Sequence, residues 1–201
     1  MLAERREKFK KISEKIGEIF SKFGLTPNQY TLISLIFVFF SFYFLISKNL
    51  ISALIFFTIS AVLDFIDGAV AKFLGMETKK GAYLDTICDR YVEGIILLGF
   101  LFLPLPDLFL PVKVWIFLAF FGSLVTTYAK AAAKEKELIS PTAGGYPELK
   151  KGLFGRGERV ILILLAMILG IFNFSLMLYP IIILAIFSNF TALQRIYLAL
   201  K

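Results

Sequence analysis

The sequence contains no histidine and only one cysteine, Cys88, among its 201 residues. Zinc and copper sites are built mainly from imidazole and thiolate ligands, so sites of that kind are excluded. One cysteine also excludes a disulfide framework within the chain. Without histidine there is no Ser–His or Cys–His pair to supply an activated nucleophile. What is available for such chemistry is a metal ion together with carboxylates.

Charged residues are sparse in the long apolar stretches of the chain. The sequence is 58% hydrophobic, contains 23 Phe and has a mean hydropathy of +0.80, which is typical of an integral membrane protein. The first 28 residues are charged rather than apolar, so we expect no cleavable signal peptide. The net charge of +7 resides mainly in residues that flank apolar stretches. Membrane topology and anionic lipid explain this charge better than a nucleic-acid partner does.

Six apolar stretches predict six membrane-spanning helices, each near the roughly 20 residues that a bilayer requires. We expect these helices at residues 29–47, 50–73, 81–103, 112–133, 158–172 and 176–197. The predicted fold is therefore an all-α integral membrane protein, with one domain over residues 1–201.

An amphipathic segment precedes the first predicted span. In residues 2–23, apolar side chains recur at helical spacing, and Lys and Glu occupy the other face. This pattern predicts a helix in the membrane interface, although a solvated or disordered tail is the alternative. Gly24 is expected to end it, and Thr26, Pro27 and Gln29 to start the next helix with a capping box. Residues 1–25 thus form the interfacial segment and residues 26–201 the six-span bundle.

Lysine and arginine predict the orientation of the chain. Nineteen of them fall in the segments expected on one side of the membrane, and only Lys48 and Lys113 fall on the other. Basic residues concentrate on the cytoplasmic side of membrane proteins. We therefore expect a multi-pass protein of the cell membrane, with both termini in the cytoplasm.

Four carboxylates interrupt the second and third predicted spans. Asp64 and Asp67 are three residues apart, and Asp85 and Asp89 are four apart, so each pair shares one face of a helix. An ionisable group in a bilayer costs at least about 2.5–3.5 kcal/mol, so these groups require compensation. Arg90 is the one cation within the same span, and a single positive charge cannot balance four negative charges.

Bound divalent cations, together with a phosphate, are the simplest compensation. An all-carboxylate ligand set favours Mg²⁺, Mn²⁺ or Ca²⁺. Asp67 and Asp89 lie near the cytoplasmic ends of their spans, at a depth of roughly 9–12 Å for a rise of 1.5 Å per residue. This depth suits a lipid head-group phosphate. The alternative is an ion or proton pathway in a transporter, which would need charges further across the bilayer.

The spacing of this acidic stretch resembles the signature of the CDP-alcohol phosphotransferase family, D-x2-D-G-x2-A-R-x8-G-x3-D-x3-D. Seven of the eight specified positions match with every gap kept, from Asp64 to Asp89. The departure is Lys72, which stands where the family has Arg. Lysine keeps the positive charge but lacks the guanidinium group that binds phosphate through two hydrogen bonds, which affects how a diphosphate is bound.

The resemblance implies transfer of a phosphatidyl-type group from a CDP-alcohol to an acceptor hydroxyl, with release of CMP. Two ions, Mg²⁺ or Mn²⁺, would be held by Asp64, Asp67, Asp85 and Asp89, and Asp89 would also be the general base. The residues with an expected role near the nucleotide are Gly68, Ala71, Lys72, Thr78 and Gly81. For the glycines, close helix packing is an equal alternative. The resemblance also implies a homodimer.

A second basic cluster predicts the acceptor site. Lys130 lies in TTYAKAAAKE, Arg156 and Arg159 in GLFGRGERV, and Arg195 in TALQRI. If they converge, these cations would bind a phosphorylated polyol; taken singly, each could equally be an interfacial anchor. The segments resemble the branch of the family that makes inositol-phosphate lipids, although Ala132 stands where that branch has Arg.

The favoured reaction therefore joins a CDP-lipid, either CDP-diacylglycerol or CDP-archaeol, to inositol 1-phosphate. Glycerol phosphate or serine as acceptor, or CDP-inositol as donor, are alternatives within the family. An anionic acceptor site argues against serine. Outside the family, the alternatives are a divalent-cation transporter and, least favoured, a purely structural membrane protein, which would leave the carboxylates unexplained.

Overall fold

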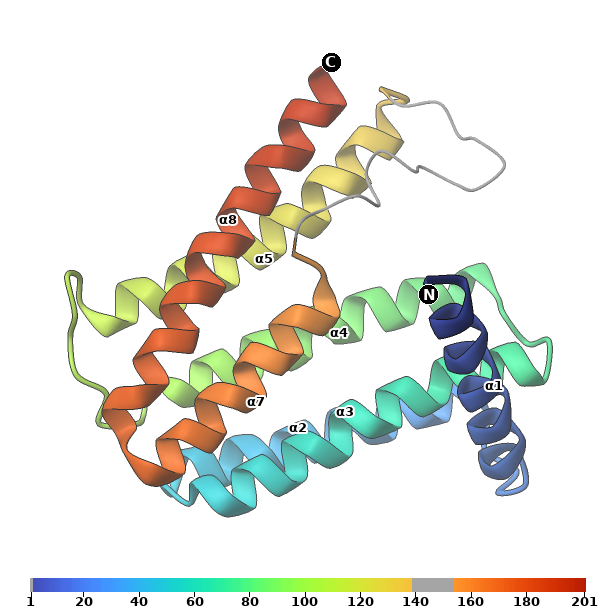
Figure 1. Cartoon of the computed structure of the whole chain (residues 1–201), viewed down its shortest axis with the longest axis horizontal. Coiled ribbons are helices and arrows are strands. Elements are labelled where there is room, and N and C mark those ends of the chain that lie inside the picture. The colour runs from blue at the N-terminus through green and yellow to red at the C-terminus, as the bar shows by residue number, and fades with distance from the viewer. Residues whose placement is uncertain (1, 139–153) are drawn as a thin grey trace. The chain divides into compact units, whose positions relative to one another are not determined.

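The computed structural model describes residues 2–138 and 154–201, with side chains from Lys11 onward. The helices of these ranges are α1 (Leu2–Ser21), α2 (Pro27–Ile46), α3 (Leu50–Phe73), α4 (Lys79–Phe100), α5 (Val112–Glu135), α7 (Arg156–Phe172), the short 3-10 helix η1 (Phe174–Met177) and α8 (Leu178–Leu200) (Figure 1). The described residues contain no β-strand. The predicted all-α fold is thus confirmed. The loop expected from Ser140 to Gly157 lies largely outside the described residues.

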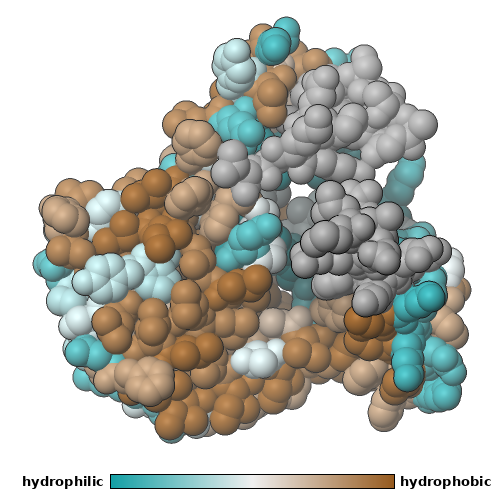
Figure 2. Space-filling model, viewed as in Figure 1, coloured by the Kyte–Doolittle hydropathy of each residue, from teal (hydrophilic) through white to brown (hydrophobic). Residues whose placement is uncertain are grey.

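Four helical stretches are long and apolar enough to cross a membrane. They are Pro27–Ile46, Leu50–Phe73, Val112–Glu135 and Phe174–Leu200. Helix α4 carries Asp85, Asp89, Arg90 and Glu93, and α7 has 17 residues, so both differ from these four in charge or in length. Hydrophobic residues cover most of the surface seen over α2 and α3 (Figure 2), as expected for helices in contact with lipid.

The helices fall into two compact units, residues 1–96 and 97–201. In the first unit, α2 and α3 form an antiparallel pair joined by a turn at Lys48, whose φ is 57°. The Ser41 hydroxyl donates to the carbonyl of Ala53 at 2.8 Å and links the two helices where both are buried. The predicted capping box at the start of α2 is confirmed, because Thr26 and Gln29 bond reciprocally.

Helix α1 packs directly against α3. At Gly17 a Cβ atom would lie 2.5 Å from the carbonyl oxygen of Ala69, so only glycine permits this approach. The Tyr30 hydroxyl of α2 donates to the carbonyl of Phe20 at 2.8 Å and ties the end of α1 to the same unit. Ile16 and Phe20 pack against the buried cluster of Tyr30, Ile66 and Val70.

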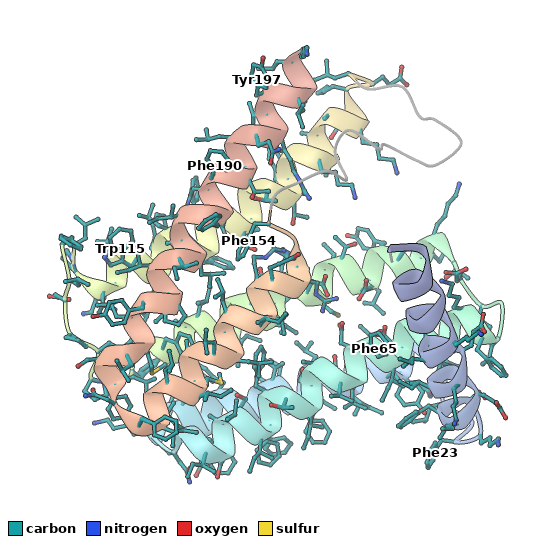
Figure 3. All side chains as sticks on the ribbon, in the orientation of Figure 1. Phe23, Phe65, Trp115, Phe154, Phe190 and Tyr197 are labelled. Carbon is teal, nitrogen blue, oxygen red and sulfur yellow. The ribbon has the colours of Figure 1, made fainter. Side chains whose placement is uncertain are left out.

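A second apolar set, on α1 and just after its end, points away from this cluster. Ile12, Ile19 and Phe23 are 53%, 46% and 68% exposed, and Phe23 projects from the end of the helix (Figure 3). Helix α1 therefore contacts α3 with one side and leaves a further apolar side uncovered.

In the second unit, α5 and α8 meet along a polar seam. A Cβ atom at Gly122 would lie 2.7 Å from the backbone nitrogen of Asn189, so the two backbones are in direct contact there. The Asn189 amide donates to the carbonyls of Leu118 on α5 and Ala185 on α8, both at 2.8 Å. One turn further along α5, the Thr126 hydroxyl lies 3.0 Å from the carbonyl of Ser188. Small residues and interhelical hydrogen bonds are typical of helix packing in membranes.

The helix bounds differ from the expected ranges by a few residues, for local reasons. Helix α3 has the expected bounds. Helix α4 begins at Lys79, two residues earlier than expected, because the hydroxyl of Thr78 accepts from the N–H of Gly81 at 3.0 Å and caps its first turn. Helix α8 begins at Leu178, because residues 174–177 form the 3-10 helix η1.

Candidate metal centre

Three of the four predicted carboxylates meet in the first unit. One carboxylate oxygen from each of Asp64, Asp67 and Asp85 lies within 4.8 Å of the others. Asp67 is six residues before the end of α3 and Asp85 six residues after the start of α4, so the two helices bring them to the same level. Oxygen atoms at this spacing could jointly coordinate a hard divalent cation. Asp89 lies one helical turn beyond Asp85 and is outside this group of three.

Asp67 is held in place by a residue that the sequence analysis missed. The hydroxyl of Thr31, on α2, donates to Asp67 Oδ2 at 2.5 Å, and both residues are at least 94% buried. Their positions are 36 residues apart, so sequence spacing gave no indication of the contact. Hydrogen bonds of this kind orient carboxylates that bind metals. Thr31 is therefore part of the candidate site.

A cavity of about 210 Å³ opens beside these carboxylates. Among its lining residues are Asp67, Asp85, Gly68, Ala71, Thr78 and Gly81. A Cβ atom at Gly68 would have no neighbour within 4 Å, so the absence of a side chain there leaves cavity space. A Cβ atom at Gly81 would lie 3.2 Å from Oδ1 of Asn28, so Gly81 also brings α4 close to α2.

Two of the residues expected near the nucleotide have additional or different surroundings. Thr78 lines the cavity and also caps α4. Lys72 lies exposed in the last turn of α3 and is not part of the lining. Pro27 and Asn28, at the start of α2, contribute to the lining and were not predicted as site residues. The TPN sequence before the first span was the available signal for them.

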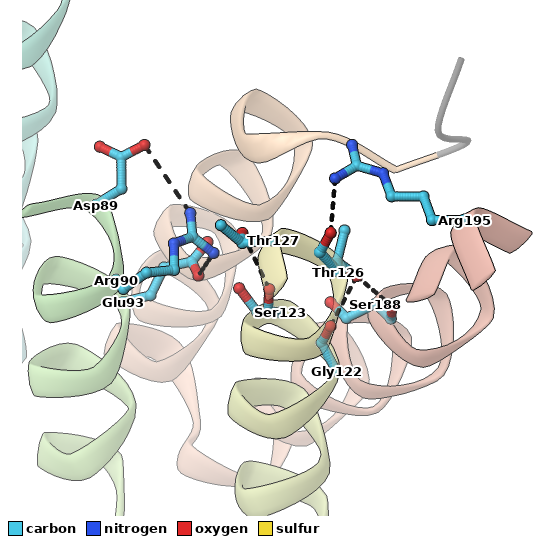
Figure 4. Close-up of polar contacts among 9 residues, drawn as sticks. All are labelled: Asp89, Arg90, Glu93, Gly122, Ser123, Thr126, Thr127, Ser188 and Arg195. Atoms are coloured by element: carbon cyan, nitrogen blue, oxygen red, sulfur yellow. Dashed lines mark hydrogen bonds and ion pairs between the residues drawn. The ribbon is translucent and has the colours of Figure 1, made fainter. Parts of the chain in front are cut away.

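Asp89 lies beside a buried ion pair on α4. Arg90 Nη1 donates to Glu93 Oε2 at 2.8 Å, whereas Arg90 Nη2 lies 3.9 Å from Asp89 Oδ2 (Figure 4). Asp89 is 8% exposed and Glu93 is 3% exposed. The acidic face of α4 therefore continues from Asp85 and Asp89 to Glu93, which the sequence analysis did not consider.

The predicted acceptor cations all belong to the second unit. Arg195 Nη1 donates to the carbonyl of Thr126 at 2.8 Å, which places it against α5 one turn before Lys130 (Figure 4). Arg156 and Arg159 lie in the first turn of α7, where Arg159 is 4% exposed. The hydrogen bond to Thr126 relates Arg195 to the helix of Lys130, and the convergence of all four cations stays a prediction.

The family pattern of the CDP-alcohol phosphatidyltransferases matches residues 24–193. The chain belongs to this family. The predicted family is thereby confirmed. As the match includes α2, α3 and α4, the CDP-alcohol phosphatidyltransferase pattern covers every residue named above as part of the candidate metal centre.

Curated relatives support this assignment over the full length of the chain. The chain is 32% identical, over an alignment of 203 positions, to archaetidylinositol phosphate synthase of Pyrococcus horikoshii, covering 100% of this chain and 97% of the relative. It is also 32% identical over 195 residues to the bifunctional IPC transferase and DIPP synthase of Aquifex aeolicus, covering 96% of this chain and 42% of that longer protein.

Solved structures of one enzyme share the fold of this chain. The crystal structure of Mycobacterium tuberculosis phosphatidylinositol phosphate synthase with CDP-DAG bound superposes with a TM-score of 0.76 at 24% identity, covering 95% of this chain and 94% of that one. The same enzyme in complex with manganese and citrate gives a TM-score of 0.76 at 23% identity, covering 94% and 89%. This similarity shows that the chain shares the fold of that enzyme.

Proposed function

We propose that this protein transfers a phosphatidyl-type group from CDP-diacylglycerol or CDP-archaeol to a hydroxyl of inositol 1-phosphate and releases CMP. The observation that carries the proposal is the approach of Asp64, Asp67 and Asp85 within 4.8 Å beside a cavity, in a chain of this family. The acceptor is supported by the full-length similarity to an archaetidylinositol phosphate synthase.

Asp64, Asp67, Asp85 and Asp89 would hold two Mg²⁺ or Mn²⁺ ions. The donor set fits, because it consists of carboxylate oxygens and the described residues bring three of them together. Such ions, when bound, draw negative charge from the diphosphate of the donor. The manganese in the Mycobacterium tuberculosis structure belongs to that enzyme and is compatible with this assignment.

Asp89 would act as the general base. It accepts the proton of the acceptor hydroxyl while that oxygen forms a bond to the phosphorus of the phosphatidyl group. The bond between this phosphorus and the bridging oxygen of the diphosphate breaks, and CMP leaves with the electron pair. Asp89 then returns its proton to solvent. No histidine could take this role instead, because the sequence contains none.

The remaining residues would bind the two substrates. Gly68, Ala71 and Gly81 leave room for the nucleotide, and Thr78 and Lys72 contribute polar contacts to it. Lys130, Arg156, Arg159 and Arg195 would bind the phosphate of the acceptor. The hydrogen bond of Arg195 to the carbonyl of Thr126, one turn before Lys130 on α5, supports a shared location for Arg195 and Lys130.

We further propose that six helices cross the membrane and that α1 lies in the cytoplasmic interface. Helices α4 and α7 would complete the six. The distribution of lysine and arginine supports cytoplasmic termini and a cytoplasmic site in the cell membrane. The exposed apolar residues Ile12, Ile19 and Phe23 support contact of α1 with lipid. The protein would act as a homodimer in phospholipid biosynthesis.

A CDP-inositol donor is the second candidate within the family. Its support is the similarity to the bifunctional IPC transferase and DIPP synthase of Aquifex aeolicus. Glycerol phosphate would satisfy the same phosphate-binding cations. A divalent-cation transporter remains the alternative outside the family and predicts cation flux without release of CMP.

CMP release by purified protein tests the proposal. The protein in detergent with Mg²⁺ and a CDP-lipid is offered inositol 1-phosphate, glycerol 3-phosphate, serine or free inositol in separate reactions. We expect release with inositol 1-phosphate only. Asp89→Asn should lower the rate by about 100-fold or more, within the range of general-base contributions.

The control for this experiment is Asp107→Asn, which removes an exposed carboxylate from the segment between α4 and α5. Release with another acceptor would contradict the acceptor assignment and keep the reaction class. If no acceptor supports release, CDP-inositol is tested as donor. Failure of every donor, together with cation flux in liposomes, would favour a transporter.

A further inference from the structure

The acidic face of α4 includes a third carboxylate, Glu93, which has no role in the proposed reaction. Asp85, Asp89 and Glu93 follow one another at intervals of four residues, so their side chains lie one above the other on the helix. Glu93 is 3% exposed and therefore more deeply buried than Asp89. A buried carboxylate is maintained only with a partner, and Glu93 has an ion pair with Arg90.

Arg90 lies closer to one of its two carboxylate neighbours than to the other. Its guanidinium forms a direct hydrogen-bonded ion pair with Glu93 at 2.8 Å and lies 3.9 Å from the nearest oxygen of Asp89. The side chains of Arg90, Asp89 and Glu93 are 12%, 10% and 4% exposed, so solvent screens these charges weakly. A small movement of Arg90 would exchange one carboxylate partner for the other.

We propose that Glu93 is a positioning residue that holds Arg90 and so keeps its positive charge from pairing fully with Asp89. The inference rests on the proposed function, in which Asp89 acts together with the metal-binding carboxylates. An Arg fork bound to Asp89 would occupy the same oxygens that a divalent cation requires. It would also place a full positive charge beside the cation in a region of low dielectric constant.

A purely stabilising ion pair makes a different prediction. If the pair only supports the fold, removing either charge takes this ion pair from the other buried group, and both single variants lose stability and Mn²⁺ affinity alike. If Glu93 controls where Arg90 lies, the two variants differ. Glu93→Gln frees Arg90 to pair with Asp89, whereas Arg90→Gln removes the competing charge altogether.

The test is direct binding of Mn²⁺ to the purified full-length protein in detergent without substrates, measured by isothermal titration calorimetry. Four proteins are compared: wild type, Glu93→Gln, Arg90→Gln and the double variant. Glu18→Gln is the matched control, because Glu18 also pairs with a nearby cation, Lys22 just after the end of α1, but is solvent-exposed. Thermal unfolding of the metal-free proteins is recorded in parallel.

We expect Glu93→Gln to weaken Mn²⁺ binding by about 10-fold or more, as removal of outer-shell partners does. Arg90→Gln should bind Mn²⁺ at least as tightly as the wild type. The double variant should recover most of the affinity lost in Glu93→Gln. If Glu93→Gln does not fold, Glu93→Asp replaces it, since the shorter side chain withdraws from Arg90, and a partial loss of affinity is expected.

Equal loss of affinity in Arg90→Gln and Glu93→Gln, or wild-type affinity in Glu93→Gln, would overturn the inference while leaving the metal centre intact. Failure of the wild type itself to bind Mn²⁺ would overturn the metal centre and this inference with it. The two failures are thus distinguished by the wild-type titration alone.

Discussion

Thr31 is the residue through which α2 contacts the candidate metal centre. Its hydroxyl is buried and donates to Asp67 at 2.5 Å, and it also lines the adjoining cavity. A carboxylate that receives such a bond keeps one orientation, and the other oxygen remains aligned for a cation. The effect of Thr31 on the reaction should therefore pass through Asp67.

Thr31→Val removes the hydroxyl and keeps the shape of the side chain. We expect Mn²⁺ affinity to fall by about 10-fold and kcat/KM for CMP release to fall with it, because Asp67 loses its orientation. Thr31→Ser should retain most of both. The measurement is calorimetric titration with Mn²⁺, followed by the CMP assay.

Thr58→Val is the control for this substitution. The hydroxyl of Thr58 donates to a carbonyl of its own helix, α3, and the residue is exposed. If Thr58→Val and Thr31→Val weaken Mn²⁺ binding equally, the bond to Asp67 has no special role.

At this scale the sequence predicted the carboxylates but not the residues that position them. Asp64, Asp67 and Asp85 were predicted from their spacing and meet in the structure. Glu93 could have been found by extending the four-residue interval beyond Asp89. Thr31 could not, because its partner lies on another helix and only the packing of α2 against α3 brings them together.

At the scale of elements, two glycines near the contact of α1 with α3 are expected to affect different properties, one the stability of the protein and the other its function. Gly17 touches the backbone of α3 at Ala69, whereas Gly68, the preceding residue of α3, borders open cavity space. These two glycines therefore serve different purposes on the same helix pair.

Gly17→Ala should destabilise the protein, because its Cβ would lie 2.5 Å from a backbone oxygen. Overpacking of this kind costs about 1–3 kcal/mol, which corresponds to a fall in Tm of several degrees. Gly68→Ala should leave Tm unchanged or raise it, since alanine favours helix, and should raise KM for the CDP-lipid. Thermal unfolding and the CMP assay measure the two effects. A fall in Tm in both variants, with KM unchanged, would contradict this separation.

Most helices were predictable from sequence because their signals are local. The capping box of Thr26 and Gln29 and the positive φ of Gly24, 70°, agree with the expected start of α2 and end of α1. The apolar residues of α1 followed one helical pattern in the sequence. Their division between Ile16 and Phe20, which pack on the unit, and Ile12 and Ile19, which do not, depends on tertiary contacts and was not predictable.

For the whole molecule, the number of membrane crossings is open to a direct test. Cys88 is the single cysteine and is buried, so introduced cysteines can be labelled against a low background. We expect cysteines at Lys22 and Lys136 to react with a membrane-impermeant maleimide only after the cells are permeabilised. Cysteines at Lys48 and Asp107 should react in intact cells.

Labelling of cysteines at Asp107 and Lys136 distinguishes six membrane crossings from four. If α4 and α7 do not span the membrane, Asp107 lies in the cytoplasm and Lys136 lies outside, which reverses their expected labelling. Lys22 serves as the cytoplasmic control, and Lys48 as the external one.

Composition and motif were sufficient for the class of protein and for its family. Mean hydropathy predicted a membrane protein, and the motif from Asp64 to Asp89 predicted the family that residues 24–193 match. The acceptor site was harder to predict. Its four cations belong to three separate helices, α5, α7 and α8. The periodicity of a sequence does not indicate which side chains of separate helices meet.

The seam between α5 and α8 has a consequence for sequence divergence. Asn189 occupies the space that a side chain at position 122 would need, and its amide also donates a hydrogen bond to a carbonyl on each helix. A larger residue at the glycine position would meet the backbone nitrogen of Asn189 as well as its side chain, so it requires the two helices to move apart. A smaller residue at the asparagine position gives up both hydrogen bonds. Both positions therefore constrain the same helix contact, and a homologue with a larger residue at the glycine position should also have lost the hydrogen bond from position 189 to α5.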